Sequence, residues 1–199
     1  LIESYEKFLA HLEIVKKYKA PILITGPRGV GKSLFVKIAE NHIQKQWNIN
    51  EDNIHRVNCS HFLDSDVARS ELFGHVKGAF TGADKNKLGW IEKAHRGSLI
   101  LEELGTLSEG VQNQFLTFVE DGEYNKVGSS KTENADVLCI ATANNPENLK
   151  TDFRDRFFEF QIPPLHYRRI DVLYYLAWFF PDLLASLTPT DILALLCYH

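Results

Sequence analysis

GPRGVGKS, residues 26–33, decides the fold of this chain, because it matches the pattern G-x-x-x-x-G-K-[ST] in full. An apolar run, Ile22-Leu23-Ile24, precedes it, and a helical pattern follows it. Strand, glycine-rich loop and helix in that order form a phosphate-binding loop, in which backbone N–H groups surround an anion at a helix N-terminus. We expect Lys32 to reach the β- and γ-phosphates of a nucleotide and the Ser33 hydroxyl to bind Mg²⁺. The expected nucleotide-binding residues of this segment are Gly26, Pro27, Arg28, Gly29, Val30, Gly31, Lys32, Ser33 and Leu34.

The composition is that of a globular protein, and the length allows one sizeable core or one α/β domain with a small appendage. The 199 residues are 44% hydrophobic and 24% charged, and the formal net charge is -4. This charge argues against a chain that grips nucleic acid over its whole surface. The start is acidic rather than basic and apolar, and no apolar run reaches the ~18 residues of a membrane helix, so we expect a cytoplasmic protein with no membrane partner. The three cysteines lack the spacing of a zinc or redox site.

Hydrophobic periodicity predicts alternating helices and strands. The expected helices cover residues 3–19, 33–47, 65–73 and 109–120, and the expected strands cover residues 22–24, 53–59, 98–101 and 137–141. Such an alternation predicts a mostly parallel sheet sandwiched by helices, the α/β fold of P-loop NTPases. The pattern becomes purely helical after Pro163-Pro164. We therefore expect a nucleotide-binding core over residues 1–163 and the start of a small α-helical lid over residues 164–199.

Polar residues follow three of the expected strands. Glu102 and Glu103 come directly after an apolar strand, where one carboxylate can help to hold Mg²⁺ and the other can orient the attacking water. Asn58 ends the second strand, and Thr142 and Asn144 follow the last one. Because ligands bind at the carboxyl edge of open α/β sheets, we expect these side chains to meet there, with Thr142, Asn144 or Asn145 near the γ-phosphate and Asn58 in contact with Glu103. In the alternative interpretation, each of these residues is a turn or capping residue.

Arg154 and Arg156 lie among acidic and aromatic residues, and two interpretations of them remain open. In the first, they form ion pairs within the chain, which contribute little to stability. In the second, one of them is an arginine finger that reaches the nucleotide of a neighbouring subunit.

The stretch from Glu71 to Ala83, ELFGHVKGAFTGA, closely resembles the signature of bacterial sigma-54-dependent transcription activators, which belong to the AAA+ class. Further segments resemble the same family in the same order: residues 57–59, 96–104, 119–124, 127–128 and 162–165. The resemblance implies a ring, usually a hexamer, with ATP bound between subunits. It also implies that Glu103 is the catalytic carboxylate and that Asn58 restrains it until sigma-54 is contacted.

The same resemblance assigns a partner-binding loop. Phe80 and Thr81 lie at its tip, which contacts sigma-54 of RNA polymerase and remodels the closed promoter complex, and a loop over residues 123–131 moves with it. The expected partner-binding residues are Gly78, Ala79, Phe80, Thr81, Gly82 and Ala83. DNA would be bound only through a domain outside this sequence.

Three departures from the family pattern affect the expected activity. Glu102 stands where Asp is usual, and its extra methylene predicts slow hydrolysis. The usual Ala-Thr-Asn reads Ala141-Thr142-Ala143-Asn144, and the segment with the two arginines is shortened, so either Arg154 or Arg156 aligns with the finger. The alternatives to an ATP-hydrolysing activator are therefore a sigma-54-binding module that binds nucleotide but scarcely hydrolyses it, and another AAA+ remodelling ATPase.

Overall fold

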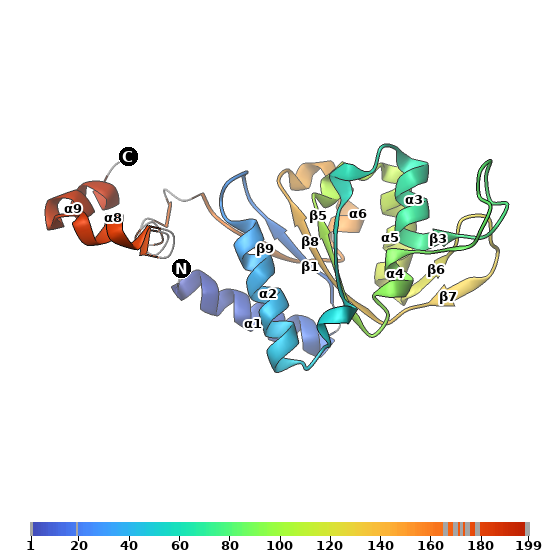
Figure 1. Ribbon diagram of the computed structural model, residues 1–199, viewed down its shortest axis with the longest axis horizontal. Coiled ribbons are helices and arrows are strands. Elements are labelled where there is room, and N and C mark those ends of the chain that lie inside the picture. Colours follow the sequence, from blue (N-terminus) through green and yellow to red (C-terminus); the bar gives the residue numbers. More distant parts are fainter. Residues whose placement is uncertain are drawn as a thin grey trace.

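A five-stranded parallel sheet lies at the centre of the fold (Figure 1). The computed structural model describes residues 2–18, 20–164, 167–168, 171, 173, 176–177 and 180–197. In spatial order the strands are β2 (Ile54–Asn58), β5 (Gly97–Glu102), β8 (Val137–Ala143), β1 (Ile22–Thr25) and β9 (Phe158–Gln161). All four neighbouring pairs are parallel, so the carboxyl ends of the strands share one edge.

Helices cover the two faces of this sheet, as predicted. On one face lie α1 (Ile2–Tyr18) and α2 (Lys32–Gln46), and on the other lie α3 (Ser65–Phe73), α4 (Trp90–Lys93), α5 (Glu109–Asp121) and α6 (Thr151–Arg154). Strand β1 shows why: Ile22 and Ile24 pack in the cluster of α1 and α2, whereas Leu23 packs in the cluster of α3 and α5. Successive side chains of a strand point to opposite faces of the sheet, so a continuously apolar strand contributes side chains to the hydrophobic clusters on both faces.

The predicted elements agree with the structure to within two residues at each end. Strand β9 was not predicted. It pairs with β1 alone and carries two phenylalanines that alternate with polar residues, which is typical of an edge strand. Four short 3₁₀ helices complete the connections within the core: η1 (Glu51–Asn53), η2 (Cys59–His61), η3 (Leu104–Thr106) and η4 (Pro146–Asn148).

Two small hairpins project at one end of the α/β core (Figure 1). The first joins β3 (Gly74–His75) to β4 (Lys87–Leu88), and the second joins β6 (Glu123–Asn125) to β7 (Thr132–Asn134). A bridge between His75 and Val127 connects them. From the sequence we expected a partner-binding loop in the first segment and a loop that moves with it in the second, and the strand pairs within them are only two and three residues long.

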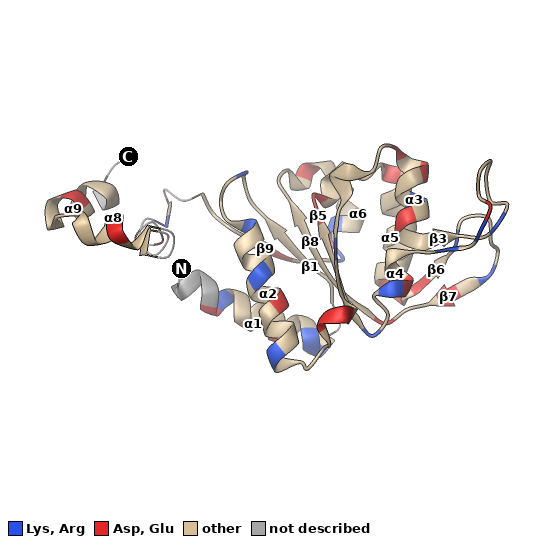
Figure 2. Ribbon diagram, viewed as in Figure 1, with Lys and Arg blue, Asp and Glu red and all other residues tan. Residues whose placement is uncertain are grey.

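Helices α8 (Pro181–Ser186) and α9 (Pro189–Cys197) follow the sheet, in agreement with the helical pattern expected after residue 163. In Figure 1 they lie apart from the strands, at the opposite end of the molecule from the two hairpins. Figure 2 shows Lys and Arg interspersed with Asp and Glu over the elements of the core rather than gathered on one of them. Across the described part of the chain, no helix combines the length and apolarity needed to span a bilayer.

Candidate functional site

The loop between β1 and α2 has the backbone shape of an anion site. Gly26, Gly29 and Gly31 have φ angles of 146°, 79° and 97°, which side-chain-bearing residues rarely adopt. At Gly26 there is also no room for a side chain, because a Cβ would lie 2.6 Å from the carbonyl oxygen of Ile162. Gly31 precedes α2 without a side-chain cap. The first N–H groups of α2 therefore face the loop, where a phosphate would be stabilised by them and by the helix dipole.

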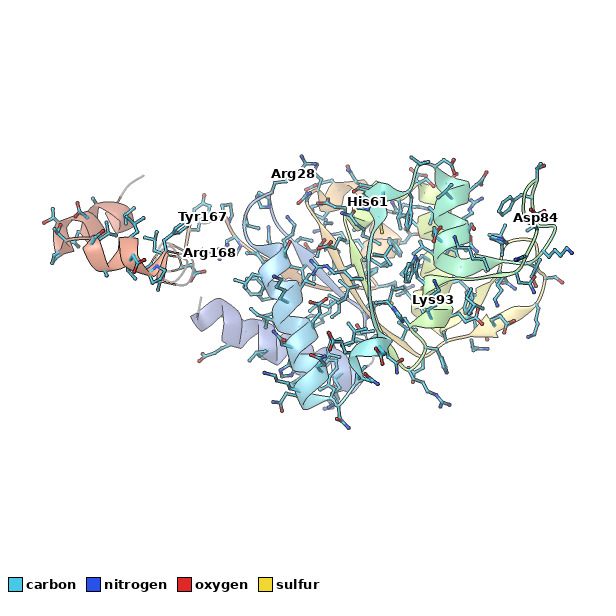
Figure 3. The ribbon with its side chains drawn as sticks, viewed as in Figure 1. Arg28, His61, Asp84, Lys93, Tyr167 and Arg168 are labelled. Atoms are coloured by element: carbon cyan, nitrogen blue, oxygen red, sulfur yellow. The ribbon has the colours of Figure 1, made fainter. Side chains whose placement is uncertain are left out.

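Lys32 lies inside this loop. Its Nζ donates hydrogen bonds to the carbonyl oxygens of Gly26, at 2.7 Å, and Pro27, at 2.9 Å. Burial lowers the pKa of Lys32, the Glu103 carboxylate opposes this shift, and Arg28 adds to it. Arg28 itself is exposed at the bend of the loop after β1 (Figure 3). The ammonium group is thus already held at the loop that the sequence assigned to phosphate.

Glu103 lies at the carboxyl end of β5 and meets polar residues at the carboxyl end of β8. The Nδ2 of Asn144 donates to both carboxylate oxygens of Glu103, each at 2.6 Å. The backbone N–H of Glu103 donates to the hydroxyl of Thr142 at 3.2 Å. Glu103 has a φ of 56°, a left-handed conformation that is uncommon for such a residue and that occurs at functional sites. The structure therefore brings Glu103, Thr142 and Asn144 together, as the sequence predicted.

Asn58 does not make the contact with Glu103 that we expected from the sequence. Its Oδ1 accepts hydrogen bonds from the backbone N–H of Ser60, at 3.0 Å, and from the Ser60 hydroxyl, at 2.7 Å, and so caps η2. In the register of β2 and β5 it lies opposite Glu102. Asn58 is thus at the correct edge of the sheet, but among the described contacts Asn144 is the partner of the Glu103 carboxylate.

Glu102 is held by an arginine that sequence reasoning missed. A guanidinium nitrogen of Arg56 donates to Glu102 Oε1 at 2.6 Å, and another lies 3.8 Å from Glu40 Oε2. Burial raises the pKa of Glu40, while the hydrogen bond with Glu102 raises the pKa of Arg56. A signal for this cluster exists in the sequence, since Arg56 lies two residues before Asn58 and therefore on the same side of β2.

The two arginines of the sequence analysis both form ion pairs within the chain. Arg154 makes a two-pronged contact with Glu159, with N···O distances of 2.9 and 3.0 Å, and the hydroxyl of Thr25 donates to the same carboxylate. Arg156 Nε lies 2.5 Å from Glu120 Oε1. The side chain of Arg156 is 55% exposed and that of Arg154 is 35% exposed, so Arg156 is the more accessible of the two.

The donor set at the sheet edge fits a magnesium ion that arrives with a nucleotide. Among the residues that the structure describes, no group of three His, Cys, Asp or Glu side chains could hold a metal without further ligands. The exposed Ser33 hydroxyl at the start of α2 and the Glu102 carboxylate at the end of β5 are oxygen donors. Mg²⁺ prefers oxygen ligands and is commonly held by one or two carboxylates together with substrate phosphates.

The segment over residues 78–83 forms a bent loop away from the phosphate-binding loop. The Gly78 N–H donates to the Ala83 carbonyl, and the Phe80 ring packs edge-on against His75 with 4.9 Å between ring centroids. Phe80 nevertheless remains 46% exposed. Figure 3 shows Asp84, the residue after this loop, at the opposite end of the core from Arg28.

The second hairpin touches this loop. A Cβ at Gly128 would lie 2.6 Å from the Cβ of Ala79, so the two segments approach each other at a point where only glycine fits. Together with the bridge between His75 and Val127, this contact couples the loop over residues 78–83 to the segment over residues 123–131.

Another contact that sequence reasoning missed joins the phosphate-binding loop to the segment after the sheet. Arg168 donates to the carbonyl oxygens of Pro163 and Val30 and pairs with Asp171 at 2.7 Å. The two charged side chains are 7% and 2% exposed. A buried guanidinium thus bonds directly to the backbone of the loop.

Comparisons with known proteins place these features in a family. A family model described as "Sigma-54 interaction domain" matches residues 2–172. The chain is 34% identical over 180 residues to the phenol regulator MopR of Acinetobacter guillouiae, covering 85% of this chain and 31% of that protein. It is 35% identical over 173 residues to the nif-specific regulatory protein of Azospirillum brasilense, covering 82% of this chain and 27% of that protein. The chain therefore spans less than a third of the length of these two relatives.

A solved structure agrees with the fold. The crystal structure of NtrX from Brucella abortus in complex with ADP matches with a TM-score of 0.71 and 26% sequence identity, covering 96% of this chain and 44% of that one. The crystal structure of the same protein in complex with ATP matches with a TM-score of 0.70 and 26% identity, covering 90% of this chain and 40% of that one.

Proposed function

The chain belongs to the sigma-54 interaction domain family, and on this premise we propose that it is the ATP-hydrolysing motor of a sigma-54-dependent transcriptional regulator. The proposal depends on one observation: the buried Lys32 in its glycine-rich loop and the hydrogen-bonded pair of Glu103 and Asn144 lie at the same edge of the sheet. Such a site combines an anion-binding loop with a positioned carboxylate, which are the two parts that hydrolysis of a nucleoside triphosphate requires.

Each group at this edge has a role in the proposed reaction. Backbone N–H groups between Arg28 and Ser33 and the ammonium of Lys32 bind the phosphates and compensate their charge. Glu103 orients a water molecule for attack on the γ-phosphorus and accepts its proton, and Thr142 and Asn144 fix the position of Glu103. Ser33 and Glu102 would hold the Mg²⁺ that accompanies the nucleotide, and the ion would supply further charge neutralisation on the phosphates.

Arg156 is our candidate for the arginine finger, and a ring of six subunits is its setting. Support comes from its greater exposure, since a residue that reaches a neighbouring subunit must be accessible. Arg154 shares the carboxylate of Glu159 with Thr25, the last residue of β1, and therefore lies closer to its own phosphate-binding loop. We assign Arg154 to positioning that strand end.

The loop over residues 78–83 is the proposed contact with sigma-54. An exposed aromatic ring between glycines offers apolar contact area on a backbone with more than one accessible shape. The proposal places this activity in the bacterial cytoplasm, with DNA bound by another part of the protein. It also divides the chain into a nucleotide-binding core over residues 1–163 and the beginning of a helical lid over residues 164–199.

The test is a comparison of wild type with Glu103→Ala. We expect both proteins to bind a fluorescent ATP analogue with similar affinity, while phosphate release by the variant falls by at least about 10²-fold, the scale of a lost general base. A Lys32→Ala variant should lose nucleotide binding itself. Equal and robust rates in wild type and Glu103→Ala would refute the assignment of Glu103.

The ion pair between Arg56 and Glu102 favours a second candidate, a module that binds nucleotide and sigma-54 with little hydrolysis. A carboxylate that is already paired is less available to the metal of the reaction. Nucleotide binding without phosphate release in wild type, together with phosphate release by Glu102→Asp, would support this candidate over the first. Capture of sigma-54 only in the presence of a transition-state nucleotide analogue would be the expected outcome for the motor.

A further inference from the structure

We infer that Arg56 is a positioning residue that draws the Glu102 carboxylate back from the phosphate-binding loop and thereby weakens Mg²⁺ binding with the nucleotide. The inference rests on the proposed nucleotide site and concerns how this chain adjusts it. Its basis is the cluster of Arg56, Glu102 and Glu40, which lies between β2, β5 and α2.

The register of the sheet sets the direction in which Glu102 is drawn. Asn58 lies opposite Glu102, whereas Arg56 lies opposite Ile100, two residues before the end of β5. Two residues of a strand span about 6.6 Å. The Arg56 side chain therefore approaches Glu102 from the direction of the amino ends of the strands, away from their carboxyl edge.

Helix α2 confirms the same direction. Ile54 and Ile100 both pack in the cluster of α1 and α2, so Arg56 and Glu102, two residues along their strands, also face α2. The second acidic neighbour of Arg56 is Glu40, which follows Ser33 by seven residues, or about 10 Å along a helix. Arg56 thus connects Glu102 to Glu40, which lies further along α2 than the Ser33 hydroxyl that is expected to hold the metal.

The charges of the cluster explain why this contact opposes the metal. The Arg56 and Glu102 side chains are 33% and 22% exposed, and their N···O distance of 2.6 Å is that of a strong charge-assisted hydrogen bond. A divalent cation must compete with this bond for the carboxylate and is also repelled by the guanidinium. The longer side chain of Glu102 makes the contact possible, because an aspartate at the same position would reach less far towards Arg56.

Removal of Arg56 would end both the competition for the Glu102 carboxylate and the repulsion of the metal ion. In an Arg56→Gln variant, Glu102 would be free to turn towards the loop, and the carboxylates of Glu102 and Glu40 would lack the guanidinium that contacts both, while Lys37 would still act on Glu40. The cluster would then carry more negative charge and bind Mg²⁺ more tightly. Loss of one charge-assisted bond corresponds to roughly a tenfold change in an equilibrium constant.

The experiment is a titration of the full chain with a fluorescent ATP analogue, first in EDTA and then over a series of Mg²⁺ concentrations. We expect the half-maximal Mg²⁺ concentration to fall about tenfold in Arg56→Gln and to fall also in Glu102→Asp. The matched control is Glu40→Gln, in which Arg56 keeps Glu102 as its only carboxylate partner of the cluster. That variant should show an unchanged or higher half-maximal concentration.

Binding in EDTA separates this inference from the proposed function. If wild type and Lys32→Ala bind equally poorly in EDTA and in Mg²⁺, the nucleotide site itself is wrong and the inference falls with it. If binding in EDTA is intact but Arg56→Gln and Glu102→Asp both leave the half-maximal Mg²⁺ concentration unchanged, only the role of Arg56 is overturned. Should Arg56→Gln fail to fold, as judged by circular dichroism, the result for Glu102→Asp decides the question.

Discussion

Replacement of Asn144 by aspartate tests the contact on which the proposed catalytic site depends. In the structure one amide nitrogen lies 2.6 Å from both oxygens of Glu103. The substitution keeps the size of the side chain but replaces this donor with a carboxylate oxygen. Two carboxylates would then face each other, and at neutral pH they must either separate or share a proton.

The size of the effect follows from the distance and the exposure. Two like charges about 4 Å apart repel by about 4 kcal/mol at an effective dielectric constant of 20. Glu103 and Asn144 are both partly exposed, so solvent screening reduces this to about 1–2 kcal/mol. For a chain of about this length 1 kcal/mol shifts Tm by about 2–4 °C, which gives a shift of about 2–8 °C.

The pH dependence has a definite sign. When the folded variant holds a proton that the unfolded chain has released, its stability falls as the pH rises. A penalty of about 1–2 kcal/mol corresponds to about 1–1.5 pH units, so we expect the Tm of Asn144→Asp to approach that of Asn144→Ala near about pH 4 and to fall below it as the pH rises to about 6. Thermal unfolding of wild type and both variants by circular dichroism would measure this difference. A gap between the two variants that is the same at about pH 4 and about pH 7 would show that residue 144 does not contact Glu103.

Three further predictions concern the loop, the core and the segment after the sheet. Burial lowers the pKa of Lys32 from 10.5, and the ammonium is the form that binds phosphate, so ATP affinity should be complete below the lowered pKa and decrease as the pH rises through it. Calorimetry at pH 7.5 and 9.5 should show weaker ATP binding with proton uptake at the higher pH, and Lys32→Ala should abolish that uptake. Gly97→Ala should be destabilising by more than about 4 kcal/mol, because the new Cβ would lie 2.0 Å from the Asn53 carbonyl oxygen. A Cβ at Gly29 would meet nothing within 4 Å, so Gly29→Ala should lower the free energy of unfolding by only about 1–2 kcal/mol, because of its positive φ. Chemical denaturation of the two variants would compare these values. Arg168→Ala deprives the buried Asp171 carboxylate of its arginine and should reduce stability by about 3 kcal/mol, and a Tm equal to wild type would contradict that interpretation.

Local chemistry explains what the sequence could predict. The glycines of residues 26–31 restrict the loop to one kind of backbone, and their spacing is visible in the sequence. Strands β5 and β8 are buried on both faces, so their apolar runs are unmistakable. The residues that follow such strands must lie at the carboxyl edge, which is why Glu103 and Asn144 were expected near each other.

Choices between side chains of similar chemistry could not be predicted. Strand β5, which leads to Glu103, lies between β2 and β8. Strand β2 ends at Asn58 and β8 is followed by Asn144, so one asparagine is available on each side of Glu103. Topology favours neither, and the choice depends on the left-handed backbone of Glu103 and on rotamers. The same limit applies to Arg56 and Arg168, whose partners are far apart in sequence and are selected by the reach of a long side chain.

The arrangement of the two asparagines also limits how the proposed catalytic edge of the sheet can be coupled to the loop over residues 78–83. The described hydrogen bonds of Asn58 use its Oδ1, which caps η2 through Ser60, and the chain continues from η2 through α3 and β3 into that loop. If Glu103 exchanged Asn144 for Asn58, the carboxylate would accept from the amide nitrogen of a residue whose oxygen still holds η2. One planar amide would then bond the Glu103 carboxylate on one side and the start of the path to Phe80 on the other, so that any rotation of the amide would move both. Asn144, which follows the last strand of the core before η4, offers no such continuous path to Phe80.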